Sequence, residues 1–310
     1  MLDCILMKSV IRIKDFAAAL NIAFIVLIAV LLVGASSVAI LVYEGTMSES
    51  SPIIVKAKWG DKVRVDYIGR FADGRVFDTS IWDVASNDAM YPKSLSFTLR
   101  NQSTYKPLEF KIGSGQMIPG FERGIIGMAI NETRVISVSP RLGYGETDVS
   151  KLVTKALVEE LPVFEQYNLS SFIAKFSETP RTGLTITHPF WGWDVICLEV
   201  NTQTGMVRVM NNPVAGAHYL VYYDSKSSTP TGWNVRVELI DSSANGGTGL
   251  IKVRNLLTEA DSGMVKGIDI NGNQFYVDRV DETSGTMILN YNPEVVGKTL
   301  YFTVTLLAVL

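Results

Sequence analysis

The longest uninterrupted apolar run of the chain lies near its N-terminus. Residues 16–43 carry no charge and only three polar side chains. As a helix this run would be about 42 Å long, whereas the hydrocarbon core of a bilayer is about 30 Å thick. Basic residues precede the run, and the first charged residues after it are acidic. By the positive-inside rule, we expect residues 1–15 to be a cytoplasmic leader, residues 16–43 a transmembrane anchor and residues 44–58 a linker.

A cleaved signal peptide is the alternative interpretation of this run. Small residues at positions 35–39 could form a cleavage site. The apolar region of a signal peptide is typically about 7–15 residues long, and this run is about twice that length. We therefore favour a retained single-pass anchor in the cell membrane, with the N-terminus cytoplasmic and the folded domains extracytoplasmic.

After the linker, the pattern becomes typical of strands. Apolar and polar residues alternate over residues 62–71, which predicts a half-buried strand, and the dipeptide Asp73-Gly74 then predicts a hairpin turn. Pro119 suits the first turn of a short helix. Further strands are expected over residues 108–112, 134–139 and 300–310. The last of these is almost continuously apolar, which favours a buried, central strand.

The region between about residues 149 and 290 has a different texture, rich in Gly, Thr and Asn. It contains an apparent repeat of about 40 residues, in which Gly192-Trp193 recurs as Gly232-Trp233. A weaker third copy includes Gly285, which matches Gly205. We interpret the copies as related β-hairpins, because three short units make a poor solenoid. Chance similarity between turn-rich β segments is the alternative.

Composition excludes several classes of protein. The 310 residues include 28 basic and 31 acidic side chains, and a net charge of −3 is unlike the basic footprint of a nucleic-acid binder. An apolar fraction of 47% is too high for a disordered chain. Two cysteines (Cys4 and Cys197) and two histidines (His188 and His218) are too few for a disulfide framework or a His-based zinc site. We expect both histidines to be structural.

Several motifs occur in the order found in FKBP-type peptidyl-prolyl cis-trans isomerases. They are Val65-x-Tyr67-x-Gly69, Asp73-Gly74-x-x-Phe77-Asp78, Met117-Ile118-Pro119-Gly120-Phe121-Glu122 and Tyr144-Gly145-Glu146. The chain resembles the SlyD-like or archaeal long form of that family. The resemblance implies an α+β fold, with an FKBP-like antiparallel half-barrel sheet around a short helix, formed by residues 59–151 and a last strand within residues 289–310. Residues 152–288 would be a β-rich, chaperone-like domain inserted in the flap, and residues 81–106 a second insertion.

The resemblance also implies a site. The expected catalytic positions are Tyr67, Phe77, Asp78, Ile118, Phe121, Tyr144 and Phe302, and the expected substrate-binding positions are Leu108 and Met117. Phe121 would form the floor under the proline ring, and the Tyr144 hydroxyl and the Ile118 N–H would donate to substrate carbonyls. Many members pair an arginine with the residue at Asp78, but the nearest counterpart here is Asp83, so the motifs leave the partner of Asp78 open. Phe121→Ala and Tyr144→Phe would then reduce turnover more than stability.

Taken singly, several of these residues have ordinary structural interpretations. Tyr67, Phe77 and Phe302 alternate on strands and would more often belong to a core, so only the joint pattern favours a pocket. The aromatic group Phe190, Trp191 and Trp193 is either an exposed patch for unfolded chains or a core cluster, and we favour the core.

The chemistry implied by the resemblance requires neither metal nor cofactor. Rotation about a peptide bond has a barrier of about 18–20 kcal/mol, and no bond is made or broken. We expect a membrane-tethered prolyl isomerase with chaperone activity on exported or unfolded, X-Pro-containing polypeptides. The alternative is a non-catalytic FKBP-like binding or scaffold subunit of a membrane complex.

Overall fold

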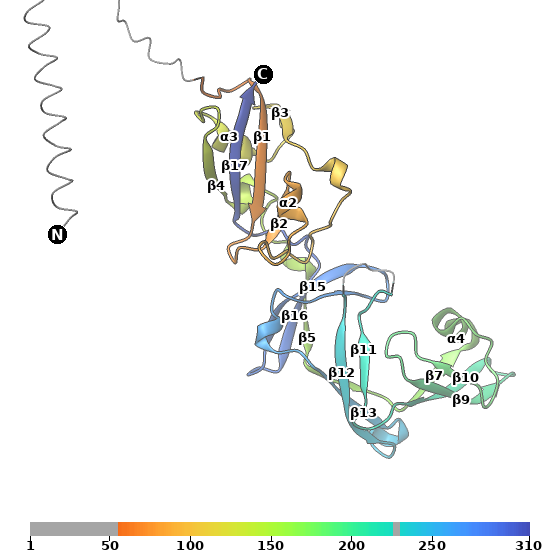
Figure 1. Ribbon diagram of the computed structural model, residues 1–310. Coiled ribbons are helices and arrows are strands. Elements are labelled where there is room, and N and C mark those ends of the chain that lie inside the picture. Colours follow the sequence, from red (N-terminus) through yellow and green to blue (C-terminus); the bar gives the residue numbers. More distant parts are fainter. Residues whose placement is uncertain (1–54, 226–229) are drawn as a thin grey trace, which may run out of the picture. The chain divides into compact units, whose positions relative to one another are not determined.

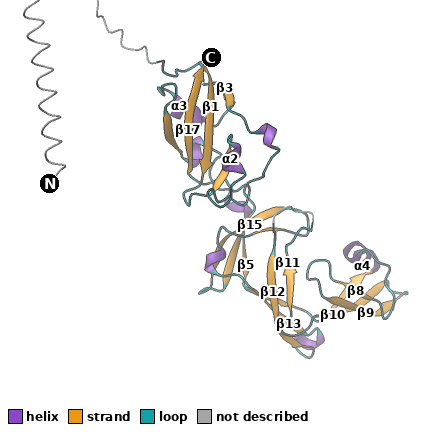
Figure 2. Cartoon of the chain, viewed as in Figure 1, coloured by secondary structure: helices purple, strands orange, loops and turns teal. Residues whose placement is uncertain are grey.

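The computed structural model describes residues 55–225 and 230–310 (Figure 1). The expected leader and anchor, residues 1–43, lie outside the described residues, as does most of the linker. Across the two described stretches, no helix has both the length and the hydrophobicity that a membrane crossing requires. Strands predominate over helices throughout (Figure 2).

The first sheet has five antiparallel strands, drawn from both ends of the described chain. They are β1 (Lys62–Arg70), β2 (Val76–Thr79), β3 (Leu108–Lys111), β4 (Thr133–Val138) and β17 (Leu300–Val309). Their order is β2-β1-β17-β4, and β3 also pairs with β1. The C-terminal strand therefore lies between β1 and β4, as Figure 1 shows, which confirms the central position predicted from its apolar sequence.

A short helix, α3 (Pro119–Ile125), packs on this sheet and completes its core. Phe121 and Ile125 are buried on the face that meets the strands. Gly120 and Gly124 permit the close approach, because a Cβ at these positions would come within 2.5 Å of the Val138 side chain and 2.3 Å of the Ile136 side chain. Pro119 occupies the first turn, as expected.

The 81–106 insertion contains one short helix, α2 (Trp82–Ala85), and one 3₁₀ turn, η1 (Gln102–Thr104). Its middle lies against β2, where the Val76 N–H donates to the Pro92 carbonyl at 2.8 Å and the Ser94 N–H donates to the Val76 carbonyl at 2.9 Å. The insertion is thus attached to the edge of the first sheet.

Between β4 and β17, residues 152–290 form three four-stranded antiparallel sheets of their own. We call this part the inserted domain. Its first strands are β5 (Leu152–Ala156), β6 (Val158–Leu161) and β7 (Phe164–Asn168), followed by α4 (Leu169–Phe176). The remaining strands are β8 (Thr185–Thr187), β9 (Asp194–Asn201), β10 (Met206–Asn212), β11 (His218–Val221), β12 (Trp233–Asp241), β13 (Leu250–Asn255), β14 (Lys266–Ile268), β15 (Gln274–Asp281) and β16 (Thr286–Asn290). Short 3₁₀ turns are η2 (Pro140–Leu142), η3 (Val149–Lys151), η4 (Asn245–Gly247) and η5 (Glu259–Asp261).

The three sheets share one plan. Their orders are β7-β10-β9-β8, β6-β13-β12-β11 and β5-β16-β15-β14, so each contains one hairpin, one short strand before it and one strand from residues 152–168. The hairpins are the copies of the sequence repeat, which confirms the interpretation as related β-hairpins. Gly192, Gly232 and Gly272 each have positive φ at the start of a hairpin, which favours glycine there.

The first two copies also share a buried polar contact. The Trp193 indole N–H donates to Asn211 Oδ1 at 3.1 Å, and the Trp233 indole N–H donates to Asn255 Oδ1 at 2.7 Å. Each asparagine amide in turn donates to a carboxylate on the strand from the start of the inserted domain. Buried indole and amide groups require such partners, so the repeated Trp and Asn stabilise the same position in two sheets.

The aromatic residues near His188 belong to the core of the inserted domain. Trp191 and Trp193 are buried, and their rings stack with centroids 4.9 Å apart, so the exposed-patch interpretation does not hold for them. Phe190 is half-buried. His188 is 5% exposed, and its Nδ1 accepts hydrogen bonds from the backbone N–H groups of Phe190 and Trp191. His188 is therefore structural, whereas His218 is exposed on β11.

This environment predicts a pH dependence of stability. Burial, with Lys175 nearby, lowers the pKa of His188 from 6.5 to about 4. Between these two pH values, His188 is protonated in the unfolded chain but neutral in the folded chain. The free energy of unfolding therefore falls as the pH drops from about 6.5 to about 4, by about 3 kcal/mol at most. The check is the free energy of unfolding by denaturant at pH 7, 6, 5 and 4. His188→Gln should flatten this dependence and His218→Gln should not; equal slopes in both variants would contradict it.

Candidate active site

Four aromatic side chains from four different elements meet beside α3. Tyr67 comes from β1, Phe77 from β2, Phe121 from α3 and Phe302 from β17. The ring centroids of Phe121 and Phe302 are 5.0 Å apart, those of Phe77 and Phe302 5.5 Å, and those of Tyr67 and Phe121 5.9 Å. Phe121 and Phe302 are buried, while Tyr67 and Phe77 are half-buried. The cluster thus has a buried floor and a partly accessible rim.

A polar network borders this rim. The Tyr67 hydroxyl donates to Asp78 Oδ2 at 2.6 Å, and Asp78 Oδ1 accepts from the Thr79 N–H at 2.9 Å. Burial and the Asp78 carboxylate raise the pKa of Tyr67 far above its usual range, so the phenol stays protonated and keeps donating. The carboxylate therefore fixes the direction of the Tyr67 ring at the edge of the cluster.

Arg100 supplies the cation beside Asp78. Its Nη2 donates to Asp78 Oδ1 at 3.1 Å and to the Thr79 carbonyl at 2.9 Å. The guanidinium also lies over the Tyr105 ring, 4.9 Å from the centroid. Asp83, the nearest counterpart by sequence position, is instead exposed on α2. Arg100 thus fills the pairing that the motifs left open, because the 81–106 insertion brings this arginine back from 22 residues downstream of Asp78.

The sequence did contain a signal for Arg100. It is the one arginine of the 81–106 insertion. The segment also contains Lys93 and Lys106, however, so its composition alone does not indicate which cation pairs with Asp78.

Tyr144 lies in the turn after η2, between two glycines. Its side chain is 51% exposed, and Gly145, with a φ of +93°, closes the turn by donating its N–H to the Pro140 carbonyl at 2.9 Å. Burial of the remaining part and the Asp78 charge raise the pKa of Tyr144. Its hydroxyl is therefore a protonated donor close enough to Asp78 to experience that charge.

Three other expected positions pack against the hydrophobic core of the first domain. Leu108, Met117 and Ile118 are half-buried there, beside a core that includes Phe121 and Phe302. Ile118 is the N-cap of α3. Glu122 is buried in the same helix; its Oε2 accepts from the Gly113 N–H at 2.9 Å and its Oε1 from the Met117 N–H at 3.3 Å. Glu122, which the sequence-based site omits, thus holds the loop that carries Met117.

A groove of about 540 Å³ opens beside Tyr67. It is lined by Tyr67, Thr79, Ser80, Arg100, Thr104, Lys106, Pro107, Leu108 and Glu109. The 81–106 insertion forms one of its walls, and of the expected site residues Tyr67 and Leu108 are the two that line it. In the part of the chain that the structure describes, no group of His, Cys, Asp or Glu side chains is arranged to hold a metal ion.

Comparisons with known proteins identify the family that this part of the chain resembles. Residues 55–159 match the family model of the FKBP-type peptidyl-prolyl cis-trans isomerases. The first domain is therefore an FKBP-type peptidyl-prolyl isomerase domain, and β17 adds to it a strand beyond the matched residues.

Individual relatives each match about a third of the chain. The "Short-type peptidyl-prolyl cis-trans isomerase" of Methanocaldococcus jannaschii is 37% identical over 105 residues, which are 34% of this chain and 57% of that protein. "FK506-binding protein 2" of Yarrowia lipolytica is 32% identical over 98 residues, which are 32% of this chain and 54% of that protein. The crystal structure of AtFKBP13 aligns at 25% identity and a TM-score of 0.22, over 31% of this chain and 70% of that one. This chain thus spans little more than half the length of these sequence relatives.

Proposed function

We propose that the protein is a peptidyl-prolyl cis-trans isomerase that acts on X-Pro bonds of polypeptides. The observation that carries the proposal is the Tyr67–Asp78–Arg100 network at the rim of the aromatic cluster, within a domain that matches the isomerase family.

The reaction needs preferential binding of a twisted amide. Such an amide has lost its resonance, so its nitrogen is pyramidal and its carbonyl less polarised, and an apolar surround favours it over the planar form. Each tenfold acceleration requires about 1.4 kcal/mol of preferential binding. In this site the proline ring would lie against Phe121 and Phe302, while the Tyr144 hydroxyl and the Ile118 N–H would donate to carbonyls of the substrate.

A proline-limited refolding assay tests the activity. The full chain, purified in detergent micelles, should accelerate the slow refolding phase of a substrate protein that contains a non-native X-Pro isomer. The control is the same detergent without protein. A rate equal to the uncatalysed rate, which corresponds to tens of seconds or more, would remove the proposal.

Tyr144→Phe isolates one donor of the site. We expect this substitution to lower kcat/KM about threefold to tenfold, because one neutral hydrogen bond contributes about 0.5–1.5 kcal/mol. The free energy of unfolding should change by less than about 0.5 kcal/mol, since half of the side chain is exposed. Tyr301→Phe, on the outer side of β17, is the matched control and should leave kcat/KM unchanged. An unchanged kcat/KM in Tyr144→Phe would exclude the hydroxyl from the mechanism.

We further propose chaperone activity for the inserted domain. Its support is a groove of about 930 Å³ whose walls include the half-buried Phe190 and the exposed Ile270. Such walls suit apolar segments of unfolded chains. Suppression of aggregation of a denatured protein by the full chain, unaffected by Tyr144→Phe, would support this activity. Equal aggregation with and without the protein would contradict it.

Tethering to the cell membrane through residues 16–43 remains part of the proposal. Its support is the long uncharged run with basic residues before it. Protease treatment of intact cells tests the topology, since residues after the anchor should be digested and residues 1–15 protected. Release of the protein from membranes by alkaline carbonate would contradict an integral anchor.

A further inference from the structure

The segment that carries Arg100 is attached to the first sheet at two places. At its start, the Ser94 N–H donates to the Val76 carbonyl on β2 at 2.9 Å. At its end, Arg100 donates to Asp78 and to the Thr79 carbonyl, again on β2. The residues between these attachments are held in part locally, since the Phe97 N–H donates to the Ser94 carbonyl at 3.3 Å, and in part by contacts from outside the insertion.

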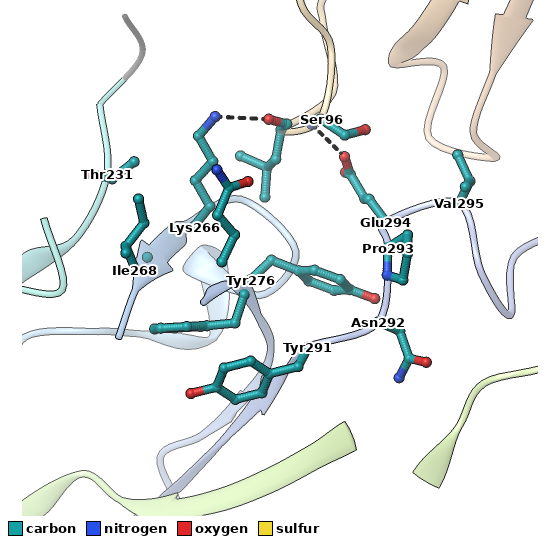
Figure 3. A pocket seen from close by; sticks show the side chains of 14 residues that line it. Ser96, Thr231, Lys266, Ile268, Tyr276, Tyr291, Asn292, Pro293, Glu294 and Val295 are labelled. Atoms are coloured by element: carbon teal, nitrogen blue, oxygen red, sulfur yellow. Dashed lines mark hydrogen bonds between the residues drawn. The ribbon is translucent and has the colours of Figure 1, made fainter. Parts of the chain in front are cut away.

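The inserted domain and the chain that follows it provide those contacts (Figure 3). The Lys266 ammonium on β14 donates to the Leu95 carbonyl at 3.0 Å, and the Ser96 N–H donates to Glu294 Oε2 at 2.8 Å. Two consecutive residues of the 81–106 insertion are thus held by side chains about 170 and 200 residues further along the chain. We call Lys266 and Glu294 the clamp.

Glu294 is a buried carboxylate with few polar partners. Its side chain is 3% exposed, and Arg75 Nη1 lies 3.7 Å from its Oε1. In the described chain, Oε1 itself accepts no hydrogen bond. A buried carboxylate is costly unless it is paired and hydrogen-bonded, so the Ser96 N–H is a contact that the carboxylate loses only at considerable cost. A cavity of about 390 Å³ adjoins the clamp. Packing by neighbouring side chains is therefore incomplete on that side of Lys266 and Glu294.

The distance along the chain from the clamp to the site is short. Ser96 and Arg100 are four residues apart, a span of at most about 14 Å. Downstream, the Arg100 N–H donates to the Tyr105 hydroxyl at 3.0 Å, which holds the segment from its other side. The backbone around Arg100 is therefore held on both sides, by the Tyr105 hydroxyl through the Arg100 N–H and by the clamp through residues 95 and 96.

We propose that Glu294 and Lys266 are positioning residues that hold residues 95–100 and so keep Arg100 on Asp78, which couples the inserted domain to the isomerase site. The role rests on the proposed isomerase function. Lys266 is the member of the clamp that belongs to the inserted domain, so its contact with the Leu95 carbonyl is the one that links that domain to the segment before Arg100.

A double-mutant cycle tests the coupling in the full chain. Arg100→Ala should lower kcat/KM about tenfold, and Glu294→Ala about threefold to tenfold. If Glu294 acts through Arg100, the double variant should be no slower than Arg100→Ala alone. Losses that multiply in the double variant, or a Glu294→Ala variant as active as wild type, would overturn the inference.

Two further variants separate positioning from a general loss of structure. Glu294→Gln keeps an oxygen that can accept the Ser96 N–H, so it should retain most of the activity that Glu294→Ala loses. Glu259→Ala, at an exposed position of η5 in the inserted domain, should leave kcat/KM unchanged. Equal losses in Glu294→Gln and Glu294→Ala would contradict a role based on the Ser96 contact.

Hydrogen–deuterium exchange gives a readout that does not depend on activity. Glu294→Ala should increase exchange in the peptide that contains residues 94–100, and Glu259→Ala should not. Unchanged exchange in that peptide would overturn the inference even if the protein is an active isomerase. If the wild-type protein proves inactive, the proposed function fails, and the exchange result still decides whether the clamp holds the segment.

Discussion

Asp78→Ala is expected to lower kcat/KM for prolyl isomerisation about tenfold to a hundredfold. The substitution removes the acceptor of the Tyr67 hydroxyl and leaves Arg100 without its carboxylate. Hydrogen bonds to charged groups contribute about 1.5–3 kcal/mol, and each 1.36 kcal/mol corresponds to a factor of ten in rate. The measurement is the rate of isomerisation of a proline-containing peptide at several substrate concentrations.

Asp83→Ala is the matched control for this experiment. Asp83 is a nearby aspartate, but it is exposed on α2 and lies outside the network. We expect its substitution to leave kcat/KM unchanged. Comparable losses in the two variants would mean that the network around Asp78 has no specific role in the reaction.

Phe121→Ala is expected to lower the free energy of unfolding by about 3–5 kcal/mol. The Phe121 ring is 3% exposed and packs against the rings of Tyr67, Phe110 and Phe302. The expectation from sequence was that this change would affect turnover more than stability. Burial alters that expectation, because a side chain that forms the floor of the site also forms the core of the sheet, and both properties should fall.

Denaturant unfolding measures this effect, with two comparisons. Phe121→Leu retains much of the volume and should cost less than the alanine variant. Val135→Ala, on the exposed face of β4, should change the free energy of unfolding by less than about 0.5 kcal/mol. A Phe121→Ala variant as stable as Val135→Ala would show that the ring is not part of the core.

Much of the first domain could be predicted because its signals are local. Alternation over residues 62–71 depends only on which side chains face the core, and β1 begins at Lys62 and ends at Arg70. The Asp73-Gly74 turn and the helix at Pro119 likewise follow from the conformations that these residues favour. The aromatic positions were found through the family resemblance, and the structure brings four of them into contact.

The repeat of the inserted domain shows which features local sequence patterns predict and which they do not. Similar residues at Gly192 and Gly232 predicted related hairpins, and each hairpin forms. The sequence of the three strands within residues 152–168 does not predict which hairpin each strand pairs with. These strands pair in reverse order: β5 joins the last hairpin and β7 the first. The sequence does not reveal this order, because the hydrogen bonds between strands are made by backbone groups that every residue carries.

By itself, the amino-acid sequence determined the strands and the helix of the first domain, the hairpins of the inserted domain and the apolar run at residues 16–43. Only the tertiary structure decided that Arg100 reaches Asp78 and that Lys266 and Glu294 hold the segment before it. The physical reason is the same in each case. Periodicity and turn preferences act over a few neighbouring residues, whereas ion pairs and hydrogen bonds between distant segments form only after the sheets have brought those segments together.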